Sequence, residues 1–204
     1  LGARIEDIGG ALVVDGIGQG QAICGLPEID CKESGSTLRF LIPLAALGRN
    51  PVHLTGHGRL MERSQSVYET LFAQQGLRFE RQNSRITVQG PLHGGKIVLD
   101  GNVSSQFITG LLFSLPLLPE DSRIEILPPF QSRGYVDLTL DTLRQFGVQA
   151  AFDGEYSLVI PGGQCYQARD AVVEGDYSQA AFFAVLSALR GGIRLANLRR
   201  DSLQ

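Results

Sequence analysis

The stretch that decides the fold is GNVSSQF, residues 101–107, which runs directly into the apolar segment 108–118. A short apolar run typical of a strand, IVL at residues 97–99, precedes it. Ser104 or Ser105 can cap the predicted helix, because a serine oxygen accepts one of the free N–H groups of the first turn. A cap needs one hydroxyl, whereas two hydroxyls and a carboxamide at a helix start also suit an anionic ligand. An ordinary capped helix is the alternative interpretation of this stretch alone.

The composition indicates a folded chain without a nucleic-acid partner. Of its 204 residues, 43% are hydrophobic and 19% are charged, which is enough to bury a core. The net charge is −3 and lysine and arginine form no run, whereas phosphate-backbone binding needs clustered cations. No apolar run reaches the about 20 residues that span a bilayer. We also expect no secretory signal, because no basic region precedes an apolar one in the first residues given. We therefore expect no membrane partner.

The three cysteines are Cys24, Cys31 and Cys165. Their spacing matches no metal site, and their odd number does not suggest a disulfide framework. We expect free thiols in a reducing cytoplasm and no bound metal.

The chain repeats a pattern with a period of about 70 residues. A glycine at position 2, 76 or 147 begins each pair of short strands, which are expected at 1–5 and 11–16, 76–79 and 85–90, and 147–150 and 156–162. Polar helix starts recur at 33–37, 102–106 and 176–179. The predicted units are the end of one at 1–30, two whole units at 31–101 and 102–174, and the start of another at 175–204. Because the repeat is cut at both ends, we expect one globular domain that is a fragment of a longer, two-domain protein.

Each predicted unit has the order helix, strand, helix, strand, strand, which indicates an α+β (mixed α/β) fold. The first helices are expected at 38–47, 107–118 and 180–189, the strands that follow at 52–54, 124–126 and 193–195, and the second helices at 66–75 and 136–146. The first helices are apolar nearly all round, which is typical of buried helices. We expect three buried parallel helices surrounded by sheets. Their N-termini would meet at one end, where an anionic substrate should bind.

Two further segments have residues suited to anion binding. In ESGSTLRF, residues 33–40, Gly35 lets a ligand approach the backbone, Ser36 and Thr37 can cap, and Arg39 follows. In TGHGRLMERS, residues 55–64, two arginines follow a predicted strand, and arginine is suited to bidentate binding of carboxylate or phosphate. A plain cap and a solvated charged loop are the alternative interpretations.

These segments, in this order, resemble the 5-enolpyruvylshikimate-3-phosphate (EPSP) synthase family over the whole chain. GNVSSQF resembles the family's shikimate 3-phosphate segment, and residues 33–40 resemble its Asn-(Ala/Ser)-Gly-Thr-x-x-Arg motif. The loop to residue 63 resembles its Arg-x-x-x-Arg-Pro loop, SRGY at 132–135 its Ser-(Lys/Arg)-Pro-Tyr, and EGDYS at 174–178 its Glu-Gly-Asp-x-Ser. The resemblance implies the α-β prism fold of enolpyruvyl transferases.

The resemblance also implies which residues bind substrate. Those for shikimate 3-phosphate are Ser104, Ser105, Gln106, Ser132 and Tyr135, and those for phosphoenolpyruvate are Gly35, Arg63 and Gln106. For Tyr135, packing in the core with a solvated hydroxyl is the alternative. The sequence departs from the family motifs at four positions, where Glu33 replaces Asn and Pro is replaced by Phe40, Ser64 and Gly134. These departures leave loop rigidity and inhibitor sensitivity undetermined.

The family transfers the enolpyruvyl group of phosphoenolpyruvate to the 5-hydroxyl of shikimate 3-phosphate and releases phosphate. The resemblance implies neither a metal nor an organic cofactor. In the family, an acid–base carboxylate and a lysine come from the other domain, and a Lys-Ser…Arg segment lies before the part seen here. Lys32 and Lys96, the lysines of this chain, match neither. We therefore expect a half-site without catalytic residues, inactive alone, whose partner is the missing second domain.

Two alternative functions remain open at this point. The chain could be a non-enzymatic phosphate- or sugar-binding repeat module. It could also resemble UDP-N-acetylglucosamine enolpyruvyl transferase, which uses a cysteine in the loop before the second helix. Here that loop has no cysteine and places Gly58 at about that position. That sister family also lacks the Ser-Ser-Gln sequence.

Overall fold

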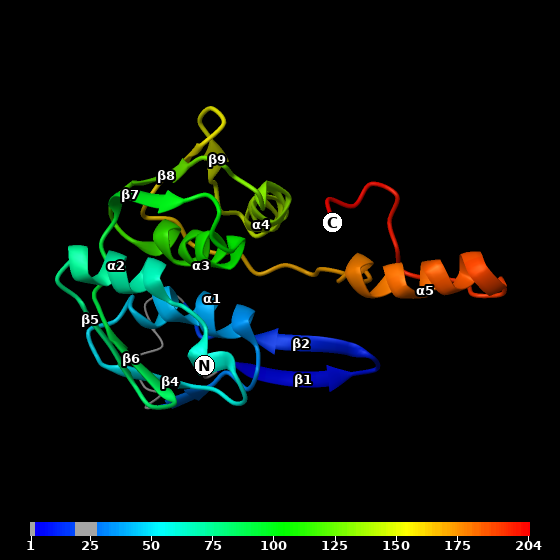
Figure 1. The fold of residues 1–204 in the computed structure, drawn as a ribbon, viewed down its shortest axis with the longest axis horizontal. Helices are drawn as coiled ribbons and strands as arrows, with labels where there is room; N and C mark the ends of the chain where they lie inside the picture. The colour runs from blue at the N-terminus through cyan, green and yellow to red at the C-terminus, as the bar shows by residue number, and fades with distance from the viewer. Residues whose placement is uncertain (1–2, 19–27) are drawn as a thin grey trace.

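Two four-stranded sheets enclose a layer of helices in this computed structural model, which describes residues 3–18 and 28–204 (Figure 1). One sheet has the order β3-β4-β6-β5 and the other β7-β8-β10-β9. The first sheet consists of β3 (Glu28–Asp30), β4 (Val52–Thr55), β5 (Arg78–Gln82) and β6 (Arg85–Gln89). The second consists of β7 (Gly95–Asp100), β8 (Ser122–Leu127), β9 (Ala151–Phe152) and β10 (Ser157–Ile160). The mixed α/β class is confirmed.

The two sheets share one topology. In each, the first two strands are parallel, and a hairpin then adds its second strand antiparallel to the inner strand. The parallel pairs need a crossover helix between their strands, and α1 (Gly35–Ala45) and α3 (Ser105–Ser114) supply it. The second helices are α2 (Ser66–Gln74) and α4 (Arg133–Gln145). Short 3₁₀ turns lie at Leu60–Glu62 and Leu115–Leu117.

Helices α1 and α3 pack side by side and run in the same direction. The start of α1 meets the start of α3, because an added Cβ on Gly35 would lie 3.5 Å from Gln106 Oε1. Further along, Phe40 and Phe113 make an edge-to-face contact with ring centroids 5.3 Å apart. An added Cβ on Gly110 would lie only 2.4 Å from the carbonyl oxygen of Arg39, so this close approach requires glycine. The predicted parallel arrangement is confirmed for these two helices.

Tyr68 connects α2 to α1 and α3 through its hydroxyl group. Its side chain is fully buried, and its hydroxyl donates to the carbonyl of Arg39 at 2.7 Å and lies 3.1 Å from the carbonyl of Phe107. A buried hydroxyl needs such partners. Around it, the helices and sheets bury large apolar side chains completely, among them Leu38, Ile42, Leu54, Ile86, Leu111 and Leu112.

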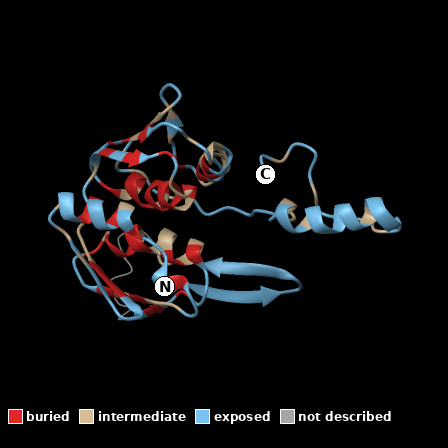
Figure 2. Cartoon of the chain, in the orientation of Figure 1, coloured by how far each residue is buried: buried red, intermediate tan, exposed pale blue. Residues whose placement is uncertain are grey.

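The prediction of a third buried helix is wrong. Helix α5 (Tyr177–Arg190) has no buried residue and extends away from the sheets in Figures 1 and 2. Phe182 is 74% exposed and Leu189 is 78% exposed. The strand predicted at 193–195 is also absent from the described structure, because none of the described strands pairs with it. The hairpin of β1 (Arg4–Ile8) and β2 (Ala11–Asp15) pairs only with itself and is likewise exposed.

Three smaller expectations also need correction. Ser34, rather than Ser36 or Thr37, caps α1, because its side chain accepts from the N–H of Thr37 at 3.1 Å. Residues 147–150 form no strand, which begins only at Ala151. The helix expected at 107–118 ends as an α-helix at Ser114 and continues as a 3₁₀ turn.

No helix among residues 3–18 and 28–204 has the length and apolar character that crossing a membrane requires.

Candidate functional site

A groove of about 530 Å³ opens where three helices begin. It is bordered by α1, α3 and α4, and its polar end collects the first residues of each helix. The five residues predicted to bind shikimate 3-phosphate all line it: Ser104, Ser105, Gln106, Ser132 and Tyr135. Phe40, Phe113 and Leu138 line its apolar end. The structure thus brings together the segments that the sequence places far apart.

The start of α3 supplies most of the polar groups. Ser104 has an extended backbone, with φ −58° and ψ 131°, and its side chain accepts from the N–H of Gln106 at 3.4 Å. This geometry makes Ser104 the cap, one of the two serines that the sequence offered. Ser105 is the first helical residue and is 8% exposed. Its hydroxyl is therefore not needed for capping and lines the groove.

Gln106 joins α3 to α1. Its Nε2 donates to Ser36 Oγ at 2.8 Å, and its Oε1 accepts from Arg39 Nη1 at 2.9 Å. Both ends of the carboxamide are therefore engaged, which fixes the orientation of the side chain. This places a polar group of fixed direction between the two helix starts.

Gly35 lies next to both Arg63 and Gln106. A Cβ added to Gly35 would lie 2.9 Å from Arg63 Nη1 and 3.5 Å from Gln106 Oε1. Gly35 is buried as the first residue of α1, whereas Arg63 is exposed after the 3₁₀ turn Leu60–Glu62. The three residues that the resemblance assigns to phosphoenolpyruvate therefore form one cluster. The absence of a side chain at Gly35 leaves room for the guanidinium.

Arg39 is a half-buried cation behind this cluster. Its Nη1 donates to Gln106 and its Nη2 donates to the carbonyl of Ser64 at 3.2 Å. Its guanidinium carbon lies 4.3 Å from the ring centroid of Phe107. Burial lowers the pKa of Arg39, with Tyr68 raising it and Arg63 lowering it, but arginine stays protonated in proteins. The sequence predicts for Arg39 only a place in a motif, because contacts between helices are not visible in a local pattern.

The start of α4 forms the third wall. Ser132 occupies the position before the first turn, and its side chain makes no capping hydrogen bond. Tyr135 is 63% exposed, so the alternative of core packing for its ring is wrong. The carbonyl of Tyr135 accepts from Thr139 Oγ1 at 2.8 Å, and Thr139 Oγ1 lies 2.9 Å from Thr109 Oγ1. This pair of threonines connects α4 to α3 beneath the groove.

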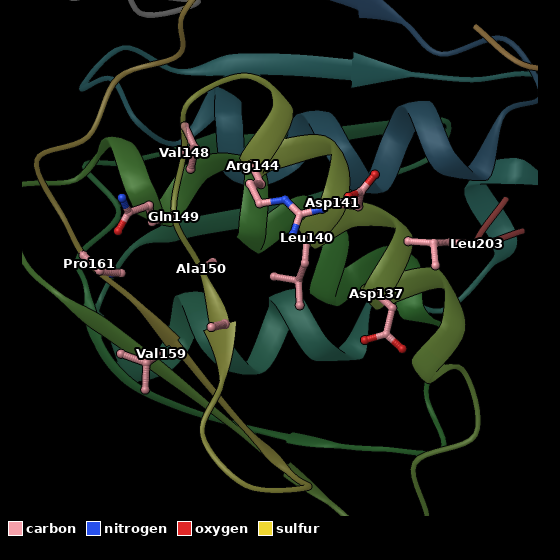
Figure 3. Close-up of a pocket in the computed structure, with 11 residues that line it drawn as sticks. Asp137, Leu140, Asp141, Arg144, Val148, Gln149, Ala150, Val159, Pro161 and Leu203 are labelled. Carbon is pink, nitrogen blue, oxygen red and sulfur yellow. Dashed lines mark hydrogen bonds and ion pairs between the residues drawn. The ribbon is translucent and has the colours of Figure 1, made fainter. Parts of the chain in front are cut away.

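A second hollow, of about 510 Å³, lies on the other side of α4 (Figure 3). It is lined by α4, by the segment that leads into β9, by part of β10, and by Leu203 from the end of the chain. Its charged lining groups are Asp137, Asp141 and Arg144, so carboxylates outnumber the cation. None of the predicted site residues lines it. Its charge does not suit a polyanion, unlike the groove at the helix starts.

The lysines and cysteines lie elsewhere. Lys32 pairs with Asp30 at 2.6 Å and Lys96 pairs with Glu125 at 2.8 Å, and neither lines the groove. Cys31 and Cys165 are free thiols, and Cys24 lies outside the described residues. Among residues 3–18 and 28–204, no group of three or more His, Cys, Asp or Glu side chains could hold a metal ion.

The arrangement suits the binding and orientation of anions. Helix N-termini present free N–H groups and a positive dipole end, the serines add hydroxyl groups, and Arg63 adds a cation. Fixed groups of this kind can hold two charged molecules in one orientation.

Comparison with known proteins gives one consistent result. The family model for EPSP synthase (3-phosphoshikimate 1-carboxyvinyltransferase) matches residues 1–204. The 3-phosphoshikimate 1-carboxyvinyltransferase of Clostridium novyi is 42% identical over an alignment of 213 positions, which covers all of this chain and 49% of the relative. That of Clostridium beijerinckii is 46% identical over 178 residues, which cover 86% of this chain and 41% of the relative. The chain therefore spans less than half the length of these curated relatives.

A solved structure supports the fold. EPSP synthase from Acinetobacter baumannii superposes with a TM-score of 0.71 at 21% identity, covering 92% of this chain and 42% of that one. At this identity the likeness concerns the fold alone.

Proposed function

The chain belongs to the EPSP synthase family, and we propose that its groove and the adjoining cluster of Gly35, Arg63 and Gln106 bind the two substrates of that family's reaction. We assign shikimate 3-phosphate to Ser104, Ser105, Gln106, Ser132 and Tyr135, and phosphoenolpyruvate to Gly35, Arg63 and Gln106. In the whole protein, these contacts serve the transfer of the enolpyruvyl group of phosphoenolpyruvate to the 5-hydroxyl of shikimate 3-phosphate, with release of phosphate. Because the family model for EPSP synthase matches the whole chain, we set aside the alternative of UDP-N-acetylglucosamine enolpyruvyl transferase.

The observation that carries this proposal is the convergence of the two residue sets on one site. Gly35 and Arg63 are close enough that a single Cβ would press on the guanidinium at 2.9 Å, and Gln106 borders both this cluster and the serines of the groove. Two anions bound here would lie next to each other, with Gln106 between them. Such proximity is what a transfer reaction between them requires.

We further propose that this chain forms one half of the site. It spans 49% of one relative and 41% of another, and its lysines are held in ion pairs outside the groove. The remaining part of the protein would be the partner that supplies proton transfer and closes over the substrates. On this proposal the chain binds ligand weakly and does not turn it over alone. We also propose a cytoplasmic location, to which the free thiols of Cys31 and Cys165 are suited.

Nuclear magnetic resonance titration of the chain with shikimate 3-phosphate tests the proposal. We expect the amide signals of Ser104, Ser105, Gln106 and Ser132 to shift, with a dissociation constant of about 1 mM or weaker, which corresponds to about 4 kcal/mol. Shikimate without its phosphate should cause no such shifts. The variant Ser105→Ala should weaken binding, whereas the matched control Ser157→Ala, on β10 next to Arg123, should not.

Two outcomes would contradict the proposal. Shifts confined to residues outside the groove would show that the site is elsewhere. Submillimolar binding by the chain alone would favour the non-enzymatic binding module, because a half-site should not hold its ligand so well.

A further inference from the structure

One half-buried arginine links the start of α3, which lines the groove, to the loop that carries Arg63. Arg39 lies on α1, and its two terminal nitrogens donate in different directions, Nη1 to Gln106 Oε1 at 2.9 Å and Nη2 to the carbonyl of Ser64 at 3.2 Å. Gln106 belongs to the helix start that carries the serines, whereas Ser64 directly follows Arg63. The guanidinium is a rigid planar fork. It therefore sets the distance and angle between these two elements.

Two further contacts fix the position of Arg39. The guanidinium carbon lies 4.3 Å from the ring centroid of Phe107, a stacking that favours one orientation. The backbone carbonyl of Arg39 accepts from the buried hydroxyl of Tyr68 at 2.7 Å. Arg39 is thus anchored where α1, α2 and α3 meet.

The Arg63 loop has particular need of this contact. Residue 64 is Ser, where the family motif described above has Pro, so the loop lacks the stiffening that a fixed φ would give. The Ser64 hydroxyl accepts from the N–H of Ser66 at 3.2 Å at the start of α2. The Ser64 carbonyl is left to accept from Arg39. The Arg63 side chain is exposed. The position of its guanidinium therefore depends on the hydrogen bond that fixes the backbone of the next residue, Ser64.

Arg39 contacts Gln106 and Ser64 but does not itself line the groove. It also keeps its Nε buried without a hydrogen-bond partner among the described residues. Leaving a buried donor unpaired is unfavourable, and an apolar residue of similar length would pack on Phe107 without that cost. An arginine at this position is therefore explained better by its fork than by packing alone.

We propose that Arg39 is a positioning residue, which aligns Gln106 with the Arg63 loop so that the two bound anions meet in the correct orientation. This inference rests on the proposed function as far as the ligands are concerned. The alignment of the two elements is a property of the ligand-free chain and can be measured without any ligand.

The test uses Arg39→Lys, which keeps the charge and removes the fork, and Arg59→Lys as the matched control. Arg59 lies in the same loop region with its side chain 90% exposed and pairs with Glu62. In the ligand-free chain, we expect Arg39→Lys to make the Gln106 side-chain amide mobile and to shift the backbone amide signals of Arg63 and Ser64. The control should change neither. Unchanged Gln106 and Ser64 signals in a folded Arg39→Lys chain would overturn the proposal.

Ligand titrations then separate positioning from general weakening. We expect Arg39→Lys to weaken phosphoenolpyruvate binding about tenfold, the effect of one charge-assisted contact. Shikimate 3-phosphate, bound mainly by serines, should lose less than about threefold. Equal losses for both ligands would indicate a merely structural role and overturn the proposal. If the unmodified chain binds neither ligand, the proposed function fails while the ligand-free signals still decide the positioning.

If Arg39→Lys does not fold, a substitution of Gln106 tests the same coupling between the start of α3 and the Arg63 loop. Gln106→Ala removes the acceptor of Nη1, and we expect the Ser64 amide signal to shift although Ser64 does not touch residue 106. An unshifted Ser64 signal would show that the fork does not couple the two elements.

Discussion

Replacing Gly35 by alanine should reduce anion binding without weakening the fold. Gly35 is the buried first residue of α1, and a Cβ there would lie 2.9 Å from Arg63 Nη1, where ordinary contacts begin at 3.4 Å. The next neighbour, Gln106 Oε1 at 3.5 Å, is already at an ordinary distance. Because Arg63 is an exposed, flexible side chain, its guanidinium moves aside and the helix stays in place.

The two effects have opposite signs and different sizes. Alanine restricts the unfolded chain and favours the helix, which raises the free energy of unfolding by up to about 1 kcal/mol. For a chain of this length, the melting temperature rises by at most about 4 °C. The displaced guanidinium loses one charge-assisted hydrogen bond to the bound anion, about 1.5 kcal/mol, or about tenfold in the dissociation constant.

Thermal unfolding and a phosphoenolpyruvate titration monitored by magnetic resonance measure the two effects. Gly134→Ala is the matched control, because Gly134 lies at the start of α4 and an added Cβ there meets nothing within 4 Å. It should give a similar stability gain with unchanged affinity for phosphoenolpyruvate. Wild-type affinity in Gly35→Ala would refute the reasoning. A fall of several degrees in melting temperature would refute the statement that Arg63 alone gives way.

Three further predictions concern packing, capping and the thiols. Gly110→Ala should lower the free energy of unfolding by about 1–3 kcal/mol, because the Cβ would lie 2.4 Å from a carbonyl oxygen of α1; urea unfolding measures this, and an unchanged midpoint would contradict the close approach. Ser104→Ala should cost about 1 kcal/mol by removing the cap of α3, and a larger loss in Ser105→Ala would reverse the assignment. At pH 8, Cys165 should be alkylated much faster than Cys31, because burial, with a smaller effect of the neighbouring carboxylate, raises the pKa of the Cys31 thiol to about 11; equal rates in peptide mass spectrometry would contradict its burial. Because an unfolded thiol has a pKa of about 8.5, the contribution of Cys31 to stability is complete below pH 8.5 and is lost as the pH rises towards 11, a loss that Cys31→Ala should abolish.

Local patterns predicted the elements well and their ends less well. The apolar spacing indicated helices at 66–75 and 136–146, and the structure has them at Ser66–Gln74 and Arg133–Gln145. The cap of α1 was misplaced because several hydroxyl residues stand near its start. What selects Ser34 is its extended backbone, with φ −86° and ψ 110°, and backbone angles are set by the packing of the whole unit.

The site was predictable as a set of segments but not as a network. The repeat predicts three polar helix starts at one end. The structure brings two of them, those of α1 and α3, to one groove together with the start of α4, whereas the start of α5 does not line it. The bond from Arg39 to Gln106 joins residues 67 positions apart. It depends on the rotation of α1 about its axis relative to α3, which the hydrophobic pattern fixes only to within a broad apolar face. The contacts of Arg39 are therefore not predictable from the sequence.

The exposed helix α5 shows what an apolar pattern does and does not predict. Its sequence resembles those of α1 and α3, and Asp176 caps it by accepting from the N–H groups of Ser178 and Gln179 at 2.8 and 3.1 Å. The helix therefore forms, because capping and propensity are local. Burial is a property of a pair of surfaces, and α1 and α3 are buried because each packs against the other and against a sheet. Leu186 and Leu189 of α5 are 44% and 78% exposed because the described residues provide no third sheet of four strands. The same pattern thus predicts a helix reliably, whereas its burial can be predicted only together with the surface that covers it.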